Sequence, residues 1–501
     1  MDASKISPYY KWIFMGIFFS CMQKIPTEDV KSLFTLLKVE STGIDFENSL
    51  VDEKKFNVLK SRNYYNGGGV AIGDVDGNGL PDIYFTSNQQ SNKLFLNDGE
   101  FRFRDVTEEA GVAGRGKWST GVAMVDINGD HLLDIYVCNS GEIEGDAHSN
   151  ELFINTANKE NGTPVFQELA ADYGINNGGF SVHSAFFDYD RDGDLDLYVL
   201  NNMSQASKTF NSADNLRYKR NRYGGDCLYQ NDSGKFTDVS AKAGIFSSII
   251  GFGLGLTVSD VNNDGWLDIY VANDFFERDY LYLNNGDGTF TEKLEQLFDH
   301  TSLSSMGSDI ADINNDGLMD IFTTDMLPED DFRLKTTFDL ETYAFNEKKT
   351  NLGYFHQVPQ NALQLNRGVL SSDSQIVFND VAMFSGVAKT DWTWGVDIID
   401  LDNDGYKDLF MTNGIFRDLN DKDYLYQMRE QNIGKVSIGG KIDFSEVIEK
   451  WPSTPLSNFV FQNQGDLTFA NRAEEWGLGD LSFPVVLHMG TWMGMAIMIW
   501  W

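Results

Sequence analysis

The chain has 501 residues and a formal net charge of −36, with 42% hydrophobic and 13% aromatic residues. The aromatic content excludes an acidic disordered chain, because disordered segments hold few aromatic residues, and the charge argues against nucleic-acid binding, which needs a basic surface. A compact fold with this charge needs cations to limit its self-repulsion, so we expect bound cations and no nucleic-acid partner.

The N-terminal residues 1–21 predict an export signal of the lipoprotein type. Two lysines precede the apolar run 12–19, which ends in Ser20 and Cys21. The run is too short to span a membrane but fits a signal-peptide core. A small residue directly before Cys is similar to a bacterial lipoprotein signal, which implies lipidation of Cys21 and a place on the cell envelope or outer membrane surface, held by the lipid anchor only. The alternative is a buried N-terminal segment; residues 22–32 are predicted to be a linker.

A nine-residue, Asp-rich loop recurs six times along the chain. The copies are DVDGNGLPD from Asp74, DINGDHLLD from Asp126, DYDRDGDLD from Asp188, DVNNDGWLD from Asp260, DINNDGLMD from Asp312 and DLDNDGYKD from Asp400. Every copy has Asp or Asn at positions 1, 3 and 5 and Asp at position 9, and an apolar segment follows it. The residues before the loops alternate between small and apolar types, which is the period of a strand. Each loop is therefore predicted to join two strands.

The spacing within the loop predicts calcium binding. Calcium takes roughly six to eight oxygen ligands in a flexible cage, and side chains at positions 1, 3, 5 and 9 with the backbone carbonyl of position 7 supply them. Glycine at position 6 permits the sharp turn. The expected ligands are Asp74, Asp76, Asn78, Leu80 and Asp82; Asp126, Asn128, Asp130, Leu132 and Asp134; Asp188, Asp190, Asp192, Asp194 and Asp196; Asp260, Asn262, Asp264, Trp266 and Asp268; Asp312, Asn314, Asp316, Leu318 and Asp320; and Asp400, Asp402, Asp404, Tyr406 and Asp408.

Two other interpretations of the loop are weaker. EF-hand loops open in the same way but need flanking helices and a later Glu, whereas strands are predicted here. A single copy is also compatible with a polar Asp-Gly hairpin turn, but the repetition of the same ligand positions favours calcium. The second loop has His131 at position 6. Because His adopts the left-handed conformation less readily than Gly, we expect this site to be the weakest.

A second element alternates with the loops and supplies two more short strands joined by an Asn/Gly turn. Its copies begin at Asn92, Asn150, Asp226, Asp279, Asn361 and Asn458. One repeat therefore contributes four strands, and four-stranded repeats of this period are typical of a β-propeller.

These loops and strands resemble the FG-GAP/VCBS repeat family, whose blades are those of the integrin-α propeller. The chain looks similar to the large bacterial surface proteins of that family and to the cartilage acidic protein group. The resemblance covers roughly residues 33 to 480, and we assign residues 33–483 to the propeller. It implies an all-β, often seven-bladed propeller that binds calcium and serves adhesion or ligand binding.

The last residues, 484–501, have no repeat signature. Met and Trp have one codon each, so the bases that encode them are known. The third base of one codon can therefore be read with the first two bases of the next as a codon of a shifted reading frame. This shifted frame gives G-D-L-D-G-D-G-D-x-D-L-V, a calcium loop whose positions 3, 6 and 9 are forced by the code. We infer an apparent frameshift near Phe483; the alternative is a genuine apolar tail. The prediction is therefore an all-β, seven-bladed propeller with six calcium loops in frame and the seventh blade lost, to which residues 33–46 would add the outer strand.

Long insertions follow the second strand of three repeats, at residues 201–225, 326–360 and 412–455. Long loops on a rigid scaffold often carry function, although packing on the rim is the alternative. We expect a cell-surface binding, adhesion or scaffolding module for a protein or glycan ligand, not an enzyme. The other hypothesis is a propeller hydrolase or lyase that processes glycans through paired carboxylates; the six His residues and the lack of a G-x-S-x-G motif in a suitable context weigh against it.

Overall fold

The computed structural model describes residues 32–54, 56–61, 63–115, 118–140, 149–160, 162–202, 213–338, 341–369, 376–437, 444–483, 487–492 and 495–500. Six antiparallel, four-stranded sheets dominate this part of the chain, each with its strands in chain order. They are β1 (Val70–Gly73), β2 (Asp82–Phe85), β3 (Lys93–Asn97) and β4 (Phe103–Asp105); β5 (Ser119–Val125), β6 (Asp134–Asn139), β7 (Glu151–Glu160) and β8 (Thr163–Glu168); β9 (Ser181–Phe187), β10 (Asp196–Asn201), β11 (Cys227–Asp232) and β12 (Lys235–Asp238); β13 (Gly253–Ser259), β14 (Asp268–Asn273), β15 (Tyr280–Asn284) and β16 (Phe290–Glu292); β18 (Ser308–Ala311), β19 (Asp320–Thr323), β21 (Ala362–Val369) and β22 (Ile376–Asp380); and β23 (Thr393–Ile399), β24 (Asp408–Asn413), β26 (Phe459–Asn463) and β27 (Phe469–Asn471).

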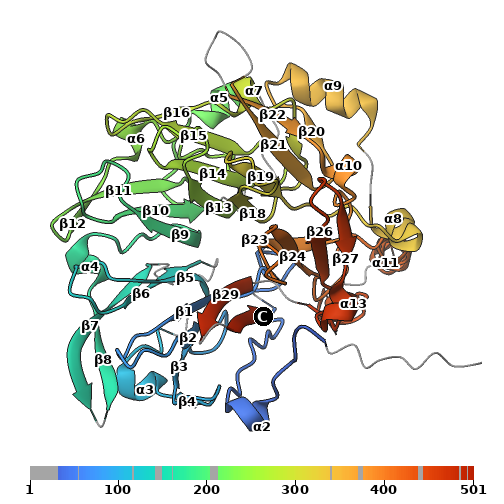
Figure 1. The fold of residues 1–501 in the computed structure, drawn as a ribbon. Helices are drawn as coiled ribbons and strands as arrows, with labels where there is room; N and C mark the ends of the chain where they lie inside the picture. Colours follow the sequence, from blue (N-terminus) through green and yellow to red (C-terminus); the bar gives the residue numbers. More distant parts are fainter. Residues whose placement is uncertain are drawn as a thin grey trace, which may run out of the picture.

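The six sheets are the blades of a β-propeller (Figure 1). The first strand of each blade lies innermost, and β1, β5, β9, β13, β18 and β23 lie side by side in that order around a central axis. The Asp-rich loop of each blade joins its first and second strands, so that position 9 pairs with the residue before position 1, as Asp82 pairs with Gly73. The described residues thus form six complete blades, and the predicted number of seven is not reached among them.

Apolar side chains fill the spaces between consecutive blades. One cluster combines Tyr84 and Leu94 of the first blade with Ile135 and Phe153 of the second, all nearly inaccessible to solvent. The second strand of each blade is buried on both faces, which explains its run of apolar residues. The hydrophobic core is therefore a ring of interfaces between blades.

A short turn of helix follows the outer strand of every blade. The turns are α3 (Thr107–Ala110), α4 (Ala170–Tyr173), α6 (Ser240–Ala243), α7 (Leu294–Leu297), α10 (Ala382–Ser385) and α13 (Ala473–Trp476). Most end at a left-handed glycine such as Gly111, as helix C-termini commonly do. The N-terminal segment has the same turn, α2 (Val39–Thr42), ending at Gly43. The strand predicted within residues 33–46 is not formed there, and this segment pairs with no strand among the described residues.

The described parts of the three insertions contain helices. They contain α5 (Ala213–Arg217), α8 (Asp331–Thr337) with α9 (Tyr343–Asn351), and α11 (Lys422–Ser437) with α12 (Phe444–Glu449). Small additional sheets pair β17 (Thr301–Ser302) with β20 (Gln357–Val358), and β25 (Leu456–Ser457) with β28 (Leu481–Ser482). Among the described residues, no helix is long and apolar enough to cross a membrane. The predicted signal and Cys21 lie outside the described residues.

The C-terminal tail occupies the space between the last and first blades. It forms a hairpin of β29 (Leu487–Trp492) and β30 (Met495–Trp500). Strand β29 lies against the innermost strands β1 and β23, as Figure 1 shows near the end labelled C. The ring of inner strands is therefore completed by a segment that is not a blade.

Candidate calcium sites

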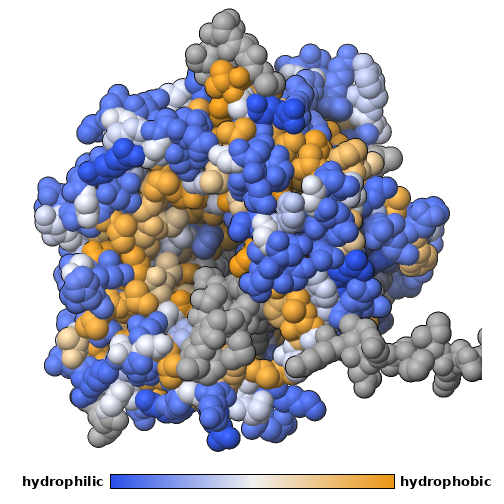
Figure 2. Space-filling model, viewed as in Figure 1, coloured by the Kyte–Doolittle hydropathy of each residue, from blue (hydrophilic) through white to orange (hydrophobic). Residues whose placement is uncertain are grey.

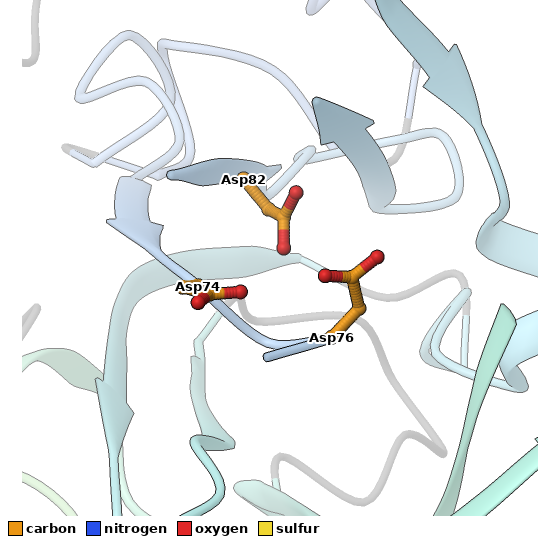
Figure 3. A group of neighbouring side chains, drawn as sticks. All are labelled: Asp74, Asp76 and Asp82. Atoms are coloured by element: carbon orange, nitrogen blue, oxygen red, sulfur yellow. The ribbon is translucent and has the colours of Figure 1, made fainter. Parts of the chain in front are cut away.

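The Asp-rich loops share one hydrogen-bond pattern. In five of them the position-1 carboxylate accepts hydrogen bonds from the backbone N–H groups of positions 5 and 6, for example from Asn78 and Gly79 to Asp74 at 3.1 and 2.7 Å. The backbone N–H of position 7 donates to the side chain of position 5 in every loop. These bonds curl the loop so that its side-chain oxygens converge, and Asp74, Asp76 and Asp82 point toward one another (Figure 3).

The second loop closes like the others despite its different residue at position 6. His131 takes φ +68°, and its backbone N–H donates to Asp126 at 2.8 Å. The glycines at the same position, such as Gly79, also have positive φ. The side chain therefore does not prevent the turn, although a non-glycine residue adopts this conformation less readily. The lower affinity that we expected for this site stays a prediction.

The position-9 carboxylates are buried in all six loops, and each accepts two backbone hydrogen bonds. One oxygen accepts the backbone N–H of position 2 and the other accepts that of an Asn in the third strand, as in Val75 and Asn97 bonding to Asp82 at 2.9 and 2.8 Å. Burial raises the pKa of these Asp carboxyls, against the opposing effect of the two N–H groups. Their pKa is raised to about 7 for Asp82, Asp196, Asp268 and Asp320 and to about 6 for Asp134 and Asp408. A cation beside them favours the ionised form.

The third-strand Asn residues were missed by sequence reasoning. They are Asn97, Asn155, Asn231, Asn284, Asn366 and Asn463. In four blades the amide also donates to the position-2 carbonyl of the preceding loop, as Asn284 does to Tyr189 at 2.8 Å. Each of these loops is thus attached to the following blade. The signal for this role was the recurrence of Asn at one place in every third strand.

The donor set fits calcium. The carboxylate oxygens of three groups lie within 4.8 Å of one another: Asp74, Asp76 and Asp82; Asp188, Asp190 and Asp192; and Asp400, Asp402 and Asp404. In the third loop, the buried Oδ1 atoms of Asp188 and Asp190 have no hydrogen-bond partner. Leaving a buried charged acceptor without a partner is costly, whereas a hard divalent cation would bind both oxygens. The remaining loops place Asn at position 3 beside Asp at position 5, as Asn262 and Asp264 show at 2.9 Å.

Contacts between loops add to this arrangement. The guanidinium of Arg191, at position 4 of the third loop, lies 4.2 Å from the ring centre of Trp266 in the fourth. The amides of Asn263 and Asn315, at the same position of the fourth and fifth loops, donate to Gly317 and Gly405 of the next loop at 3.0 and 2.9 Å. The third to sixth loops are therefore linked in a chain along one end of the ring.

The described part of the first insertion, residues 213–225, is partly structural. Arg217 is buried, and its Nε donates a hydrogen bond to Glu277 Oε1 at 2.5 Å. In the second insertion, Phe345 and Tyr354 pack on Phe276. By contrast, Tyr343 is 83% exposed. Individual insertion residues therefore divide between packing and exposed surface, a division that composition alone does not reveal.

The blades and their loops define a β-propeller of repeated Asp-rich hairpins. The chain carries FG-GAP-like repeats, since the model of that family matches residues 64–137 and 260–323. The expected resemblance is confirmed by its relatives. Cartilage acidic protein 1 of Xenopus tropicalis is 28% identical over 300 residues, 55% of this chain and 42% of that protein. Integrin alpha-3 of Mus musculus is 37% identical over 81 residues, 14% of this chain and 8% of that protein.

The matched region is less than half the length of each of these relatives. Among solved structures, the chain is similar to an Agrocybe aegerita lectin described as recognising non-reducing terminal N-acetylglucosamine. The TM-score is 0.41 at 15% identity, over 83% of this chain and 82% of that one.

Proposed function

We propose that this protein is a calcium-stabilised propeller that binds a protein or glycan ligand at the cell surface. The observation that carries the proposal is the repeated loop, whose third copy leaves Asp188 Oδ1 and Asp190 Oδ1 without partners. The likeness to cartilage acidic protein 1 and integrin alpha-3 supports an extracellular binding role. Equilibrium dialysis with calcium tests the metal: several ions should bind per chain, and a chain that binds none would overturn the proposal.

The end of the ring opposite the calcium loops is the proposed ligand face. A pocket of about 250 Å³ lies there, between connections that leave the second strands or enter the first strands of the blades. Its aromatic lining consists of Tyr65, Phe252, Phe275, Trp392, Trp394 and Trp451. Ligand pockets are commonly apolar with few polar groups, and aromatic rings anchor both proteins and sugars. Figure 2 shows one face of the ring, with a hollow near its centre and apolar residues around that hollow.

Binding to immobilised glycans and to cell surfaces tests this face. We expect a ligand that is retained with calcium and released by chelator, and whose binding Trp392→Ala weakens at least tenfold. Tyr343→Ala is the matched control, because it removes an exposed aromatic ring on α9 and should leave binding unchanged. Equal binding by both variants would show that the ligand site lies elsewhere. We propose binding without catalysis, and release of reducing sugar from the same glycans would contradict that part.

A seven-position ring is the second part of the proposal. The turn glycine of one blade packs on the outer strand of the next: a Cβ on Gly244 would lie 2.7 Å from the carbonyl oxygen of Phe290. The last blade repeats this contact with the N-terminal segment, because a Cβ on Gly477 would lie 2.6 Å from the carbonyl oxygen of Phe34. The Phe34 N–H also bonds Trp476 O at 2.9 Å. These contacts support an outer strand of a seventh blade within residues 33–46.

Sequencing the gene around Phe483 tests the frameshift, and restoring the other frame tests the blade. We expect the corrected protein to bind one further calcium ion and to protect residues 33–46 from hydrogen exchange. If the corrected protein bound no further calcium ion and left residues 33–46 unprotected, the seventh blade would be refuted. Lipid anchoring through Cys21 is the third part, supported by the short apolar run before it.

A further inference from the structure

Two carboxylates stand apart from the calcium loops, inside the central channel. The inner strand of each blade places one residue at the same level of the ring, three residues before its loop: Ala71, Ala123, Ala185, Thr257, Asp309 and Asp397. Four of these side chains are small or neutral. Asp309 and Asp397 belong to neighbouring blades, β18 and β23, and both line a cavity of about 530 Å³ along the axis.

The two carboxylates have very different surroundings. Asp309 is held by backbone N–H groups: Ile310 donates to its Oδ1 at 2.8 Å, and Ile398 of the next blade donates to its Oδ2 at 2.7 Å. Within the described residues, Asp397 makes no hydrogen bond or ion pair. Burial and the negative charge of Asp309 raise the pKa of Asp397 to about 7. Asp397 is therefore a partly buried acceptor that lines the cavity without a hydrogen-bond donor among the described residues, and the charge of Asp309 repels it.

Nothing among the described lining residues neutralises this pair. The cavity is lined by glycines, small hydroxyl residues, aliphatic and Met side chains, Trp394 and His183, and by no Lys or Arg. A carboxylate partly removed from water without a counter-charge is costly, and such groups are commonly paired or bind metals. A hard divalent cation can bind two carboxylates when water molecules complete its coordination, and this cavity has room for water.

We propose that Asp309 and Asp397 form a cation site in the central channel, separate from the loops, that binds a hydrated divalent cation. Asp309 is the oriented ligand, because its two backbone donors fix the carboxylate while leaving lone pairs free. Asp397 is the ligand whose charge the cation neutralises. The site joins two neighbouring blades across their inner strands, so that the metal would tie the ring together from the inside as the loops do at one end.

The isosteric variant Asp397→Asn tests the site, because it removes the charge without breaking any hydrogen bond seen in the described residues. Bound calcium and magnesium are counted by equilibrium dialysis with elemental analysis of the intact chain. We expect one ion fewer per chain than in the wild type. Asp232→Asn, an exposed position at the end of β11, is the control and should lose none. Asp188→Ala should lose one loop ion while keeping the channel ion, which separates failure of this site from failure of the loops.

Thermal unfolding supplies a second readout whose sign depends on the metal. In chelator, Asp397→Asn should melt at the wild-type temperature or above it, because an uncompensated buried charge is gone. With calcium present, the rise in melting temperature on adding metal should be smaller for the variant than for the wild type. Asp309→Asn should lose the same ion. An unchanged count of both metals in Asp397→Asn would overturn the proposal. A variant that melts lower in chelator and in calcium alike would also overturn it.

Discussion

Replacing Asp226 by Asn should stabilise the protein at alkaline pH. The third strand of every blade is preceded or opened by a buried amide or carboxyl side chain: Asn92, Asn150, Asp226, Asp279, Asn361 and Asn458. The side-chain oxygen of each of these residues accepts a hydrogen bond from a backbone N–H near the end of the second strand. In the third blade, the Asn201 N–H donates to Asp226 at 3.0 Å. Burial raises the pKa of Asp226 to about 7, although Asn201 and the Tyr198 hydroxyl bond to it.

The second blade shows that Asn can fill this role. There, Asn150 accepts from Asn139 at 2.8 Å and donates to the Tyr136 hydroxyl at 2.9 Å. In Asp226→Asn the Tyr198 hydroxyl would become the acceptor in the same geometry. A pKa raised from 3.8 to about 7 corresponds to an upper bound of roughly 4 kcal/mol for keeping the ionised form folded above pH 7. Because the amide has its own desolvation cost, we expect a gain of about 1–3 kcal/mol at pH 8.

The pH dependence gives the prediction its sign. Between about pH 4 and 7 the folded wild type retains a proton on Asp226 that the unfolded chain has released, so wild-type stability falls as the pH rises through this window and levels off above it. Asn carries no such proton. The advantage of Asp226→Asn in urea unfolding at saturating calcium should therefore grow from pH 5 to pH 8. Asp232→Asn removes an exposed carboxyl on the same strand and should follow the wild type. A constant difference between Asp226→Asn and the wild type at all pH values would refute the reasoning.

Three further perturbations follow from the site. Asn366→Ala leaves the buried carbonyl of Val261 without its amide donor and should lower the free energy of unfolding by about 2–4 kcal/mol, whereas the exposed Asn285→Ala should change it by less than about 0.5 kcal/mol. Excess chelator should lower the melting temperature, because calcium binds the folded state, and Asp188→Ala should bind one ion fewer; an unchanged melting curve would contradict calcium stabilisation. Cys21→Ser should abolish labelling by a palmitate analogue in cells and release the protein from membranes; equal membrane partition of both forms would count against the anchor.

The loops and strands could be predicted because their signals are local. Position 1 bonds to backbone groups only a few residues later, as Asp74 does to Gly79, so the spacing within the loop already contains the geometry. The alternation before each loop fixed the inner strands in the same way. The third-strand Asn residues could not be assigned, since Asn284 meets Tyr189 only after the next blade has folded beside it. The recurring Asn marks the position in the sequence, but its partner in the neighbouring blade is set only by the packing of one blade on the next.

Two other expectations depended on partners that the sequence could not place. Residues 33–46 carry the pattern of an outer strand, but a strand forms only beside an edge, and there the segment keeps its helical turn and its contacts with α13. Arg217 lies in the first insertion, for which the sequence left function and packing on the rim as alternatives. It became a buried partner of Glu277, because the insertion folds back over the fourth blade. Local pattern therefore predicts an element, and long-range contact decides whether it pairs, is buried or binds.

Calcium and blade packing should be coupled in one direction around the ring. In the fourth loop, the backbone of Val261 is held twice: its N–H bonds Asp268 of the same blade at 3.0 Å, and its carbonyl accepts from Asn366 of the fifth blade at 2.9 Å. Loss of the metal in Asp260→Ala should loosen this loop and, through Asn366, the third strand of the next blade. Hydrogen exchange should therefore accelerate in β21 as well as in the fourth blade, while β11 of the preceding blade keeps its protection. Equal acceleration in β11 and β21, or a change confined to the loop, would show that the Asn contacts do not transmit metal binding between blades.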